Sequence, residues 1–199
     1  MKRLFFTLAL ICASLGAVAQ TDQTVSFELQ PDGTFKTAEG KDFVILNFND
    51  KKAPELYQMF LAAAFKGFQT EHRTTSQVEN VAFAVEGITD TLSLRGAGTV
   101  VMQHAFQIMF HFKDERVKVD APVLTKAYAC MMVFGRCDKF YEQDSTFKEW
   151  VQNGSAFLKF KDGVPSKEKF MRNWIVINKK TNELINCVLR QLQSASEDW

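Results

Sequence analysis

Hydrophobic and polar residues alternate over short stretches of this 199-residue chain, a pattern typical of strands that bury one face. The alternation begins with Val25, Phe27 and Leu29, and the Pro-Asp-Gly sequence that follows predicts a hairpin within residues 25–37. Residues 42–49 are mostly β-branched or aromatic, which predicts a buried strand.

A helix is predicted next, because the spacing of apolar residues changes to that of a helix face. Asp50 is the expected cap, Pro54 and Glu55 suit the first turn, and Gly67 is the expected end. The apolar residues form one broad face that should pack on a sheet. They are Leu56, Tyr57, Phe60, Leu61, Ala64, Phe65 and Phe68.

Renewed alternation predicts four strands in meander order after this helix, at residues 78–86, 88–95, 99–113 and 117–124. The polar residues 70–77 are expected to form a loop, Gly96 to Gly98 a break or bulge, and Asp114 to Arg116 a turn. The third strand should carry four apolar residues on one face. They are Phe106, Ile108, Phe110 and Phe112.

The last third of the chain predicts a short helix in residues 138–152 and a long helix from a Ser166 cap to about residue 193. The near-heptad apolar stripe of the long helix favours a core-facing surface. The order β-α-β-β-β-β-α predicts an α+β fold, an antiparallel sheet with two main helices on one face. We expect one domain, residues 20–199, whose core is residues 40–125 with helix 166–193 and whose insertion is 126–165.

The first 19 residues predict a cleavable signal peptide. Lys2 and Arg3 precede an apolar run from Leu4 to Leu15, and Ala17-Val18-Ala19 forms a cleavage site. About 12 apolar residues are too few for a spanning helix, which needs roughly 20. We therefore expect export to the periplasm, the outer membrane or the medium, with no transmembrane span after cleavage.

Cleavage changes the charge of the chain. It leaves 22 of the 24 basic residues against 23 acidic ones, so the formal charge moves from +1 to −1. No basic stripe remains to neutralise phosphates, which argues against nucleic acid as a partner.

Three cysteines survive cleavage: Cys130, Cys137 and Cys187. A continuous helix or strand would hold Cys130 and Cys137 apart, so pairing of either with Cys187 is favoured unless the segment turns. Because the count is odd, at least one thiol is left over. We expect no structural disulfide.

Two short sequences resemble a known family. Ala53-Pro54-Glu55-Leu56-Tyr57 opens the first helix, and Leu94-Arg95-Gly96-Ala97-Gly98 ends a later strand. Together with the leader, they resemble the exported, DUF4468-like Bacteroidota domains of unknown function with a TBP-like fold. The resemblance covers roughly residues 40–125 and implies the fold. It supplies no catalytic residues, and the topology alone implies no DNA binding.

Catalytic and metal-binding motifs are sparse. Ser145 and Lys148 match the S-x-x-K of serine β-lactamases, but the chain has no S-D-N and no K-T-G sequence. His104 and His111 are seven residues apart in one strand and should face opposite sides, and His72 lies in a polar segment. We therefore expect no metal and no cofactor.

The leading hypothesis is an exported, non-enzymatic binding or interaction domain. Its candidate binding face is the strand surface that carries Gln107, Met109 and His111. A protein, a small apolar ligand and a second copy of the chain remain open as partners. One alternative is an apolar-ligand carrier with a cavity lined by some of the 19 phenylalanines. The other is a small envelope serine hydrolase that uses Ser145 and Lys148.

Overall fold

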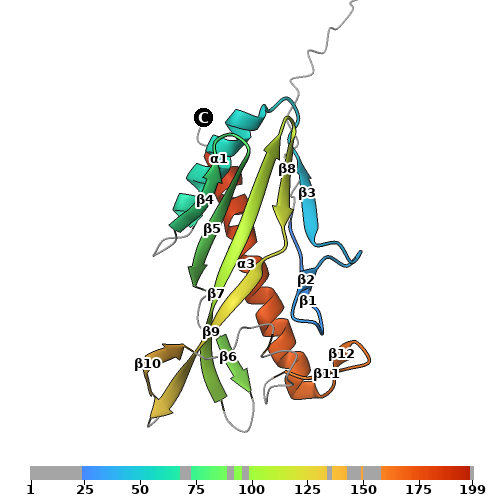
Figure 1. The fold of residues 1–199 in the computed structure, drawn as a ribbon, viewed down its shortest axis with the longest axis vertical. Helices are drawn as coiled ribbons and strands as arrows, with labels where there is room; N and C mark the ends of the chain where they lie inside the picture. The colour runs from blue at the N-terminus through green and yellow to red at the C-terminus, as the bar shows by residue number, and fades with distance from the viewer. Residues whose placement is uncertain are drawn as a thin grey trace, which may run out of the picture.

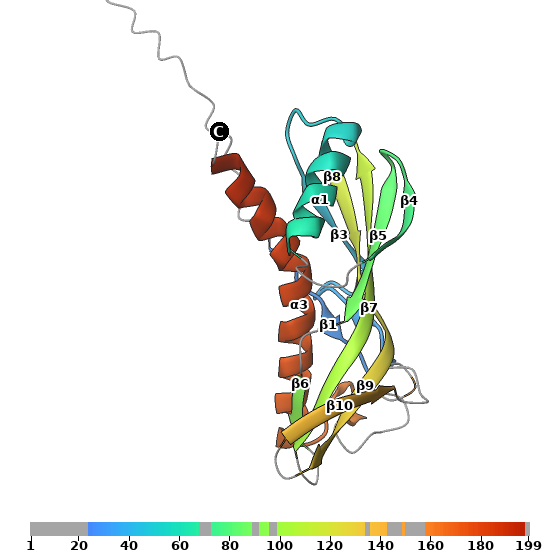
Figure 2. The same cartoon turned by 90° about the vertical axis from the view of Figure 1, so that its left-hand side faces the viewer.

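Two long helices lie on one side of an antiparallel eight-stranded sheet (Figure 2). The computed structural model describes residues 24–67, 73–88, 92–95, 99–133, 136–142, 149 and 158–197. The helices are α1 (Ala53–Gly67) and α3 (Glu168–Glu197). This arrangement confirms the predicted α+β fold with two helices on one sheet face.

Strand β7 (Thr99–Lys113) is the centre of the sheet (Figure 1). Along one edge it pairs with β5 (Ala82–Ile88) and then β6 (Leu92–Arg95). Along its other edge it pairs with β8 (Arg116–Asp120) and then β9 (Val123–Val133). The remaining strands are β3 (Phe43–Asn47), β4 (Arg73–Val78) and β10 (Arg136–Glu142), and each of these, like β6, pairs with a single strand.

Two small hairpins accompany the main sheet. The first joins β1 (Glu28–Leu29) to β2 (Phe35–Lys36), as predicted. Its turn places Gly33 at a φ of 81°, a conformation that glycine adopts without strain. The second joins β11 (Phe160–Lys161) to β12 (Val164–Pro165) beside α3 (Figure 1).

The structure corrects two elements of the sequence prediction. The predicted loop at residues 70–77 contains β4, and the predicted helix at 138–152 begins instead with β10. Both strands lie at the ends of the strand order β10-β9-β7-β5-β4. Their sequences, Arg-Thr-Thr-Ser-Gln-Val and Arg-Cys-Asp-Lys-Phe-Tyr-Glu, lack a regular alternation of apolar and polar residues, so the pattern did not indicate strands. Strands β9 and β10 also carry the sheet into the segment 126–165 that was expected to be an insertion.

Helix α1 ends at Gly67 and buries Leu56, Tyr57 and Phe60, as predicted. Phe65, however, is 62% exposed, so the apolar face is narrower than the sequence indicated. The predicted cap is also wrong. Asp50 has a φ of 59°, and the N–H of Ala53 donates instead to Asp114 Oδ1 at 2.9 Å. The cap therefore comes from the turn between β7 and β8.

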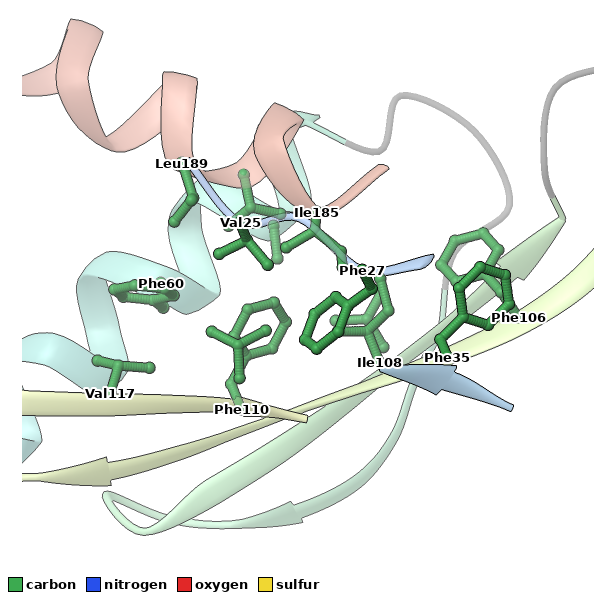
Figure 3. Close-up of a cluster of buried hydrophobic side chains, with 14 of the residues drawn as sticks. Val25, Phe27, Phe35, Phe60, Phe106, Ile108, Phe110, Val117, Ile185 and Leu189 are labelled. Atoms are coloured by element: carbon green, nitrogen blue, oxygen red, sulfur yellow. The ribbon is translucent and has the colours of Figure 1, made fainter. Parts of the chain in front are cut away.

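Residues 24–29 form an extended segment that lies between α3 and the sheet, and we call it the N-terminal strap. It runs antiparallel to α3, and Val25, Phe27 and Leu29 are at most 1% exposed. Figure 3 shows Val25 and Phe27 beside Ile185 of the helix and Ile108 of the sheet. The strap therefore forms part of the core.

Three asparagines of α3 bind the backbone of the strap. Asn182 accepts a hydrogen bond from the N–H of Phe27 at 2.8 Å and donates one to its carbonyl at 2.9 Å. Asn186 makes the same pair with Val25 at 2.9 and 2.8 Å. Asn178 accepts from the N–H of Leu29 at 2.8 Å. We call these three side chains the asparagine ladder.

The ladder forms because the rise of one helical turn nearly equals the repeat of an extended chain. Four residues of an α-helix advance about 6 Å, and two residues of a strand advance about 6.6 Å. Asparagines four residues apart therefore meet alternate residues of an extended chain. At the far end Trp174 donates its indole N–H to the carbonyl of Leu29 at 2.8 Å.

Replacing Asn182 with alanine should destabilise the fold. Asn182→Ala removes both partners of the Phe27 backbone, and an unsatisfied buried polar group costs about 1–3 kcal/mol. We expect a loss of that size in the free energy of unfolding measured with urea. Arg190→Ala, an exposed position further along α3, is the control and should change it by less than about 0.5 kcal/mol. Equal effects of the two substitutions would show that the ladder contributes nothing.

Replacing Asp114 with alanine should destabilise the start of α1. The Ala53 N–H, and next Lys52 at 3.1 Å, lower the pKa of the Asp114 carboxyl. The charged carboxylate is therefore favoured in the folded state, and its contribution is lost as pH falls through the lowered pKa. Asp114→Ala should reduce the Tm by a few degrees at pH 7, whereas Lys113→Ala should not. An unchanged Tm for Asp114→Ala would rule out the cap.

Candidate binding face

Side chains alternate along β7 between the helices and the opposite face of the sheet. Phe106, Ile108, Phe110 and Phe112 are buried on the helix side, as predicted. Gln107, Met109 and His111 are half-buried and lie on the face that α1 and α3 leave uncovered (Figure 2). The structure thus places the three predicted residues together, and their role in binding stays a prediction.

A polar cluster occupies one end of this open face. Asp120 accepts from Lys118 Nζ at 2.6 Å through one carboxylate oxygen and lies 2.7 Å from His111 Nε2 through the other. The Lys118 ammonium also lies 5.0 Å from the centre of the Phe43 ring, within the range of a cation–π contact. These contacts hold four side chains of three strands in defined positions.

A second polar pair lies further along β7. Gln107 Nε2 donates to Glu86 Oε1 at 2.8 Å, across the pair β5–β7. Lys118, Asp120 and Glu86 each therefore contact a polar or oppositely charged side chain on this face.

Large apolar side chains surround the polar groups. Strand register places them on the same face: Ile45 is opposite Lys118, Val123 is opposite Gln107, and Ile88 is opposite Ala105. All three apolar residues are exposed, as is Val78 on β4. Sequence reasoning missed this set, because the residues come from four strands whose pairing is a property of the folded sheet.

His104 lies on the other side of β7 and is completely buried. Burial lowers its pKa from 6.5 to about 3, so the imidazole is neutral at physiological pH. The opposite placement of His104 and His111 confirms the prediction from their spacing. His72 lies outside the described residues, and within the described ranges no group of His, Cys, Asp and Glu is arranged to hold a metal ion.

The aromatic side chains between α1 and the sheet contact one another. Tyr57 and Phe83 have ring centres 5.7 Å apart, Phe60 and Phe110 are at 5.6 Å, and Phe83 and Phe110 are at 5.2 Å. Such spacings are those of packed edge-to-face and offset rings. The phenylalanines therefore fill this part of the core, which favours a packed interior over a ligand cavity.

The cysteines differ from expectation. Cys130 is disulfide-bonded and Cys187 is free, so pairing with Cys187 and the absence of any disulfide were both wrong predictions. Strands β9 and β10 pair antiparallel, which places Cys137 opposite Met132. The partner of Cys130 lies outside the described side chains. Cys187 donates instead to the carbonyl of Gly67 at 3.3 Å, where α1 and α3 meet.

Two candidate motifs lie outside the described residues. Ser145 and Lys148 fall in the undescribed segment 143–148, so the serine hydrolase hypothesis stays a prediction. The segment from Gly96 to Gly98 is likewise outside the described ranges. As for membranes, the helices seen in the described ranges are too short or too polar to cross a bilayer.

Two solved structures are similar to this chain. A TBP-like protein from Parabacteroides distasonis superposes with a TM-score of 0.50 at 11% identity, over 76% of this chain and 90% of that one. A DUF4468 family protein from Bacteroides ovatus has a TM-score of 0.48 at 14% identity, over 82% and 86% of the two chains. The first similarity confirms the predicted TBP-like fold. No family model and no curated protein sequence matches the chain.

The buried His104 should make stability depend on pH. Between pH 6.5 and about 3 the unfolded chain binds a proton at this histidine and the folded chain does not. The free energy of unfolding should therefore not depend on His104 above pH 6.5. Below pH 6.5 it should fall by at most about 1.4 kcal/mol per pH unit because of this group.

The variant His104→Gln isolates this contribution. Its free energy of unfolding, measured by denaturant titration across the same pH range, should fall less steeply than that of the wild type. Parallel curves for the two proteins would contradict a buried neutral imidazole, whatever the offset between them.

Proposed function

We propose that this protein is an exported, non-enzymatic binding domain that engages another protein through the uncovered face of its sheet. The observation that carries the proposal is the one-sided arrangement of the fold. Both long helices pack on one face of the sheet (Figure 2). The strand register places exposed Ile45, Ile88 and Val123 and half-buried Met109 on the other face. Exposed apolar residues gathered on one face are typical of interaction sites.

The open face suits a protein better than a small ligand. Its residues come from neighbouring strands of a continuous sheet, and such a surface presents a broad area. Protein interfaces combine apolar contacts with polar groups whose hydrogen bonds are satisfied. The paired groups His111–Asp120–Lys118 and Gln107–Glu86 supply that second component, and their mutual contacts reduce the cost of desolvating them.

The overall charge of the chain argues against nucleic acid. A phosphate backbone requires an excess of cations, and removal of the predicted leader leaves the chain with a formal charge of −1. On the open face, Lys118 is paired with Asp120. The TBP-like topology does not change this conclusion, because function depends on the surface residues and not on the fold.

Export is part of the proposal. The leader predicted in residues 1–19 would place the domain in the periplasm, at the outer membrane or outside the cell, where the disulfide at Cys130 is compatible with an oxidising environment.

Site-specific photo-crosslinking tests the face directly. Benzoylphenylalanine at Gln107, introduced in cells that naturally make the protein, should yield a discrete covalent adduct of higher mass. The same probe at Lys179, an exposed position on α3, should yield none. Met109→Asp placed beside the Gln107 probe should reduce the adduct at least about tenfold, since it introduces a charge into the apolar surface.

The adduct also distinguishes the partners. A mass of twice the chain identifies a second copy on this face, and any other discrete mass identifies a different protein. An adduct at Lys179 but not at Gln107, or an adduct unaffected by Met109→Asp, would overturn the proposal.

A further inference from the structure

Strand β3 forms an outer edge of the sheet, at the margin seen in Figure 1. It pairs with β8 alone among the described strands. We propose that this edge is a dimerisation site, where β3 pairs antiparallel with β3 of a second copy of the chain and the two sheets become continuous. The inference goes beyond the binding proposed for the open face, because it concerns backbone groups at the edge. The side chain of Ile45 belongs to both surfaces.

In an antiparallel pair, alternate residues of a strand bond to the neighbouring strand, and the residues between them direct their backbone groups outward. Asp42 accepts from Ala121, and Phe48 donates to Glu115, so even-numbered residues of β3 bond to β8. Val44 lies opposite Val119 and Leu46 opposite Val117, so these two even-numbered residues also bond to β8. The N–H and C=O groups of the intervening Phe43 and Ile45 therefore point away from β8. Within the described ranges, no backbone hydrogen bond engages either residue at this edge.

The other outer strands carry features that discourage edge pairing. Strand β4 contains a register shift between Thr74 and Ser76, and β10 contains one between Cys137 and Phe140. Bulges disrupt the ladder and twist an edge away from new partners. Strand β3 keeps an unbroken register with β8 from Phe43 to Asn47. Strand β6, which pairs with β7 alone, also has an unbroken register, but it is shorter and carries the charged Arg95.

The side chains of β3 also lack the charges that commonly prevent an edge strand from pairing with another chain. The sequence Phe-Val-Ile-Leu-Asn contains no charged residue, and Ile45 at the centre is 41% exposed. Soluble proteins commonly place lysine or proline on such an edge to prevent association. An uncharged, regular edge strand is the surface on which strand addition occurs.

The occupant that fits is a second copy, because β3 is complementary to itself. An antiparallel pairing centred on Ile45 places Ile45 against its own counterpart across a two-fold axis. Val44 then meets Leu46 of the second copy on the helix side, and Phe43 meets Asn47 on the open side. No like charges are brought together within the paired segment. The outward groups of Ile45 would bond to the same groups of the other copy.

Molecular mass in solution tests the proposal. The chain from Gln20 to Trp199 should be a dimer by sedimentation equilibrium at about 100 μM and dissociate on dilution. Ile45→Lys should raise the dissociation constant at least about tenfold. Ile88→Lys is the matched control, because Ile88 is also 41% exposed but lies on β5, which β7 and β8 separate from β3. It should leave the dimer intact.

A second variant separates backbone pairing from apolar contact. Ile45→Pro keeps an apolar side chain and removes only an N–H that does not bond to β8, a position where an edge strand tolerates proline. It should also give a monomer, and thermal unfolding should show that it is folded.

Hydrogen exchange provides a readout that needs no variant. The amides of Phe43 and Ile45 should be protected in the dimer and lose protection on dilution, while those of Val44 and Leu46 remain protected at all concentrations. A wild-type monomer at about 100 μM, or a dimer that persists in both Ile45 variants, would overturn the proposal. Neither result bears on crosslinking at Gln107, so failure of one proposal leaves the other testable.

Discussion

The asparagine ladder is the interaction on which the rest of this fold depends. An extended segment buried under a helix has backbone groups on its helix side that no strand satisfies, and leaving them unpaired would be costly. Asn182 and Asn186 each supply one acceptor and one donor, so their amides replace a strand on that side. The near match between four helical residues and two extended residues repeats the contact along the helix.

This contact joins two parts of the chain that are about 150 residues apart and places three large apolar side chains in the core. The strap fills the space between α3 and the sheet, which α1 fills at the other end (Figures 2 and 3). One face of the sheet is completed in this way, and the polar and apolar residues of the opposite face remain accessible. The same packing that stabilises the protein thus leaves the other face of the sheet uncovered.

The local sequence predicted the elements whose buried side chains form a regular apolar pattern. The alternation of Phe106, Ile108, Phe110 and Phe112 located β7, and the helical spacing from Leu56 to Ala64 located α1. Strands β4 and β10 were missed because their sequences lack a regular alternation of apolar and polar residues. The cap at Asp114 was missed because its partner, Ala53, is distant in sequence. The spacing of Asn178, Asn182 and Asn186 was visible in the sequence but has no meaning until an extended segment lies beside the helix.

The sequence by itself determined which faces of the strands and helices are apolar, the order of the main elements and hence the TBP-like fold. It also placed Gln107, Met109 and His111 on one side of their strand, because side chains alternate with a period of two. Only the tertiary structure decided what surrounds them: Asp120 and Lys118 beside His111, Glu86 beside Gln107, and the exposed isoleucines of other strands. Strand pairing, register and the edge position of β3 arise from contacts between distant segments, and a local pattern carries no information about which segments will meet.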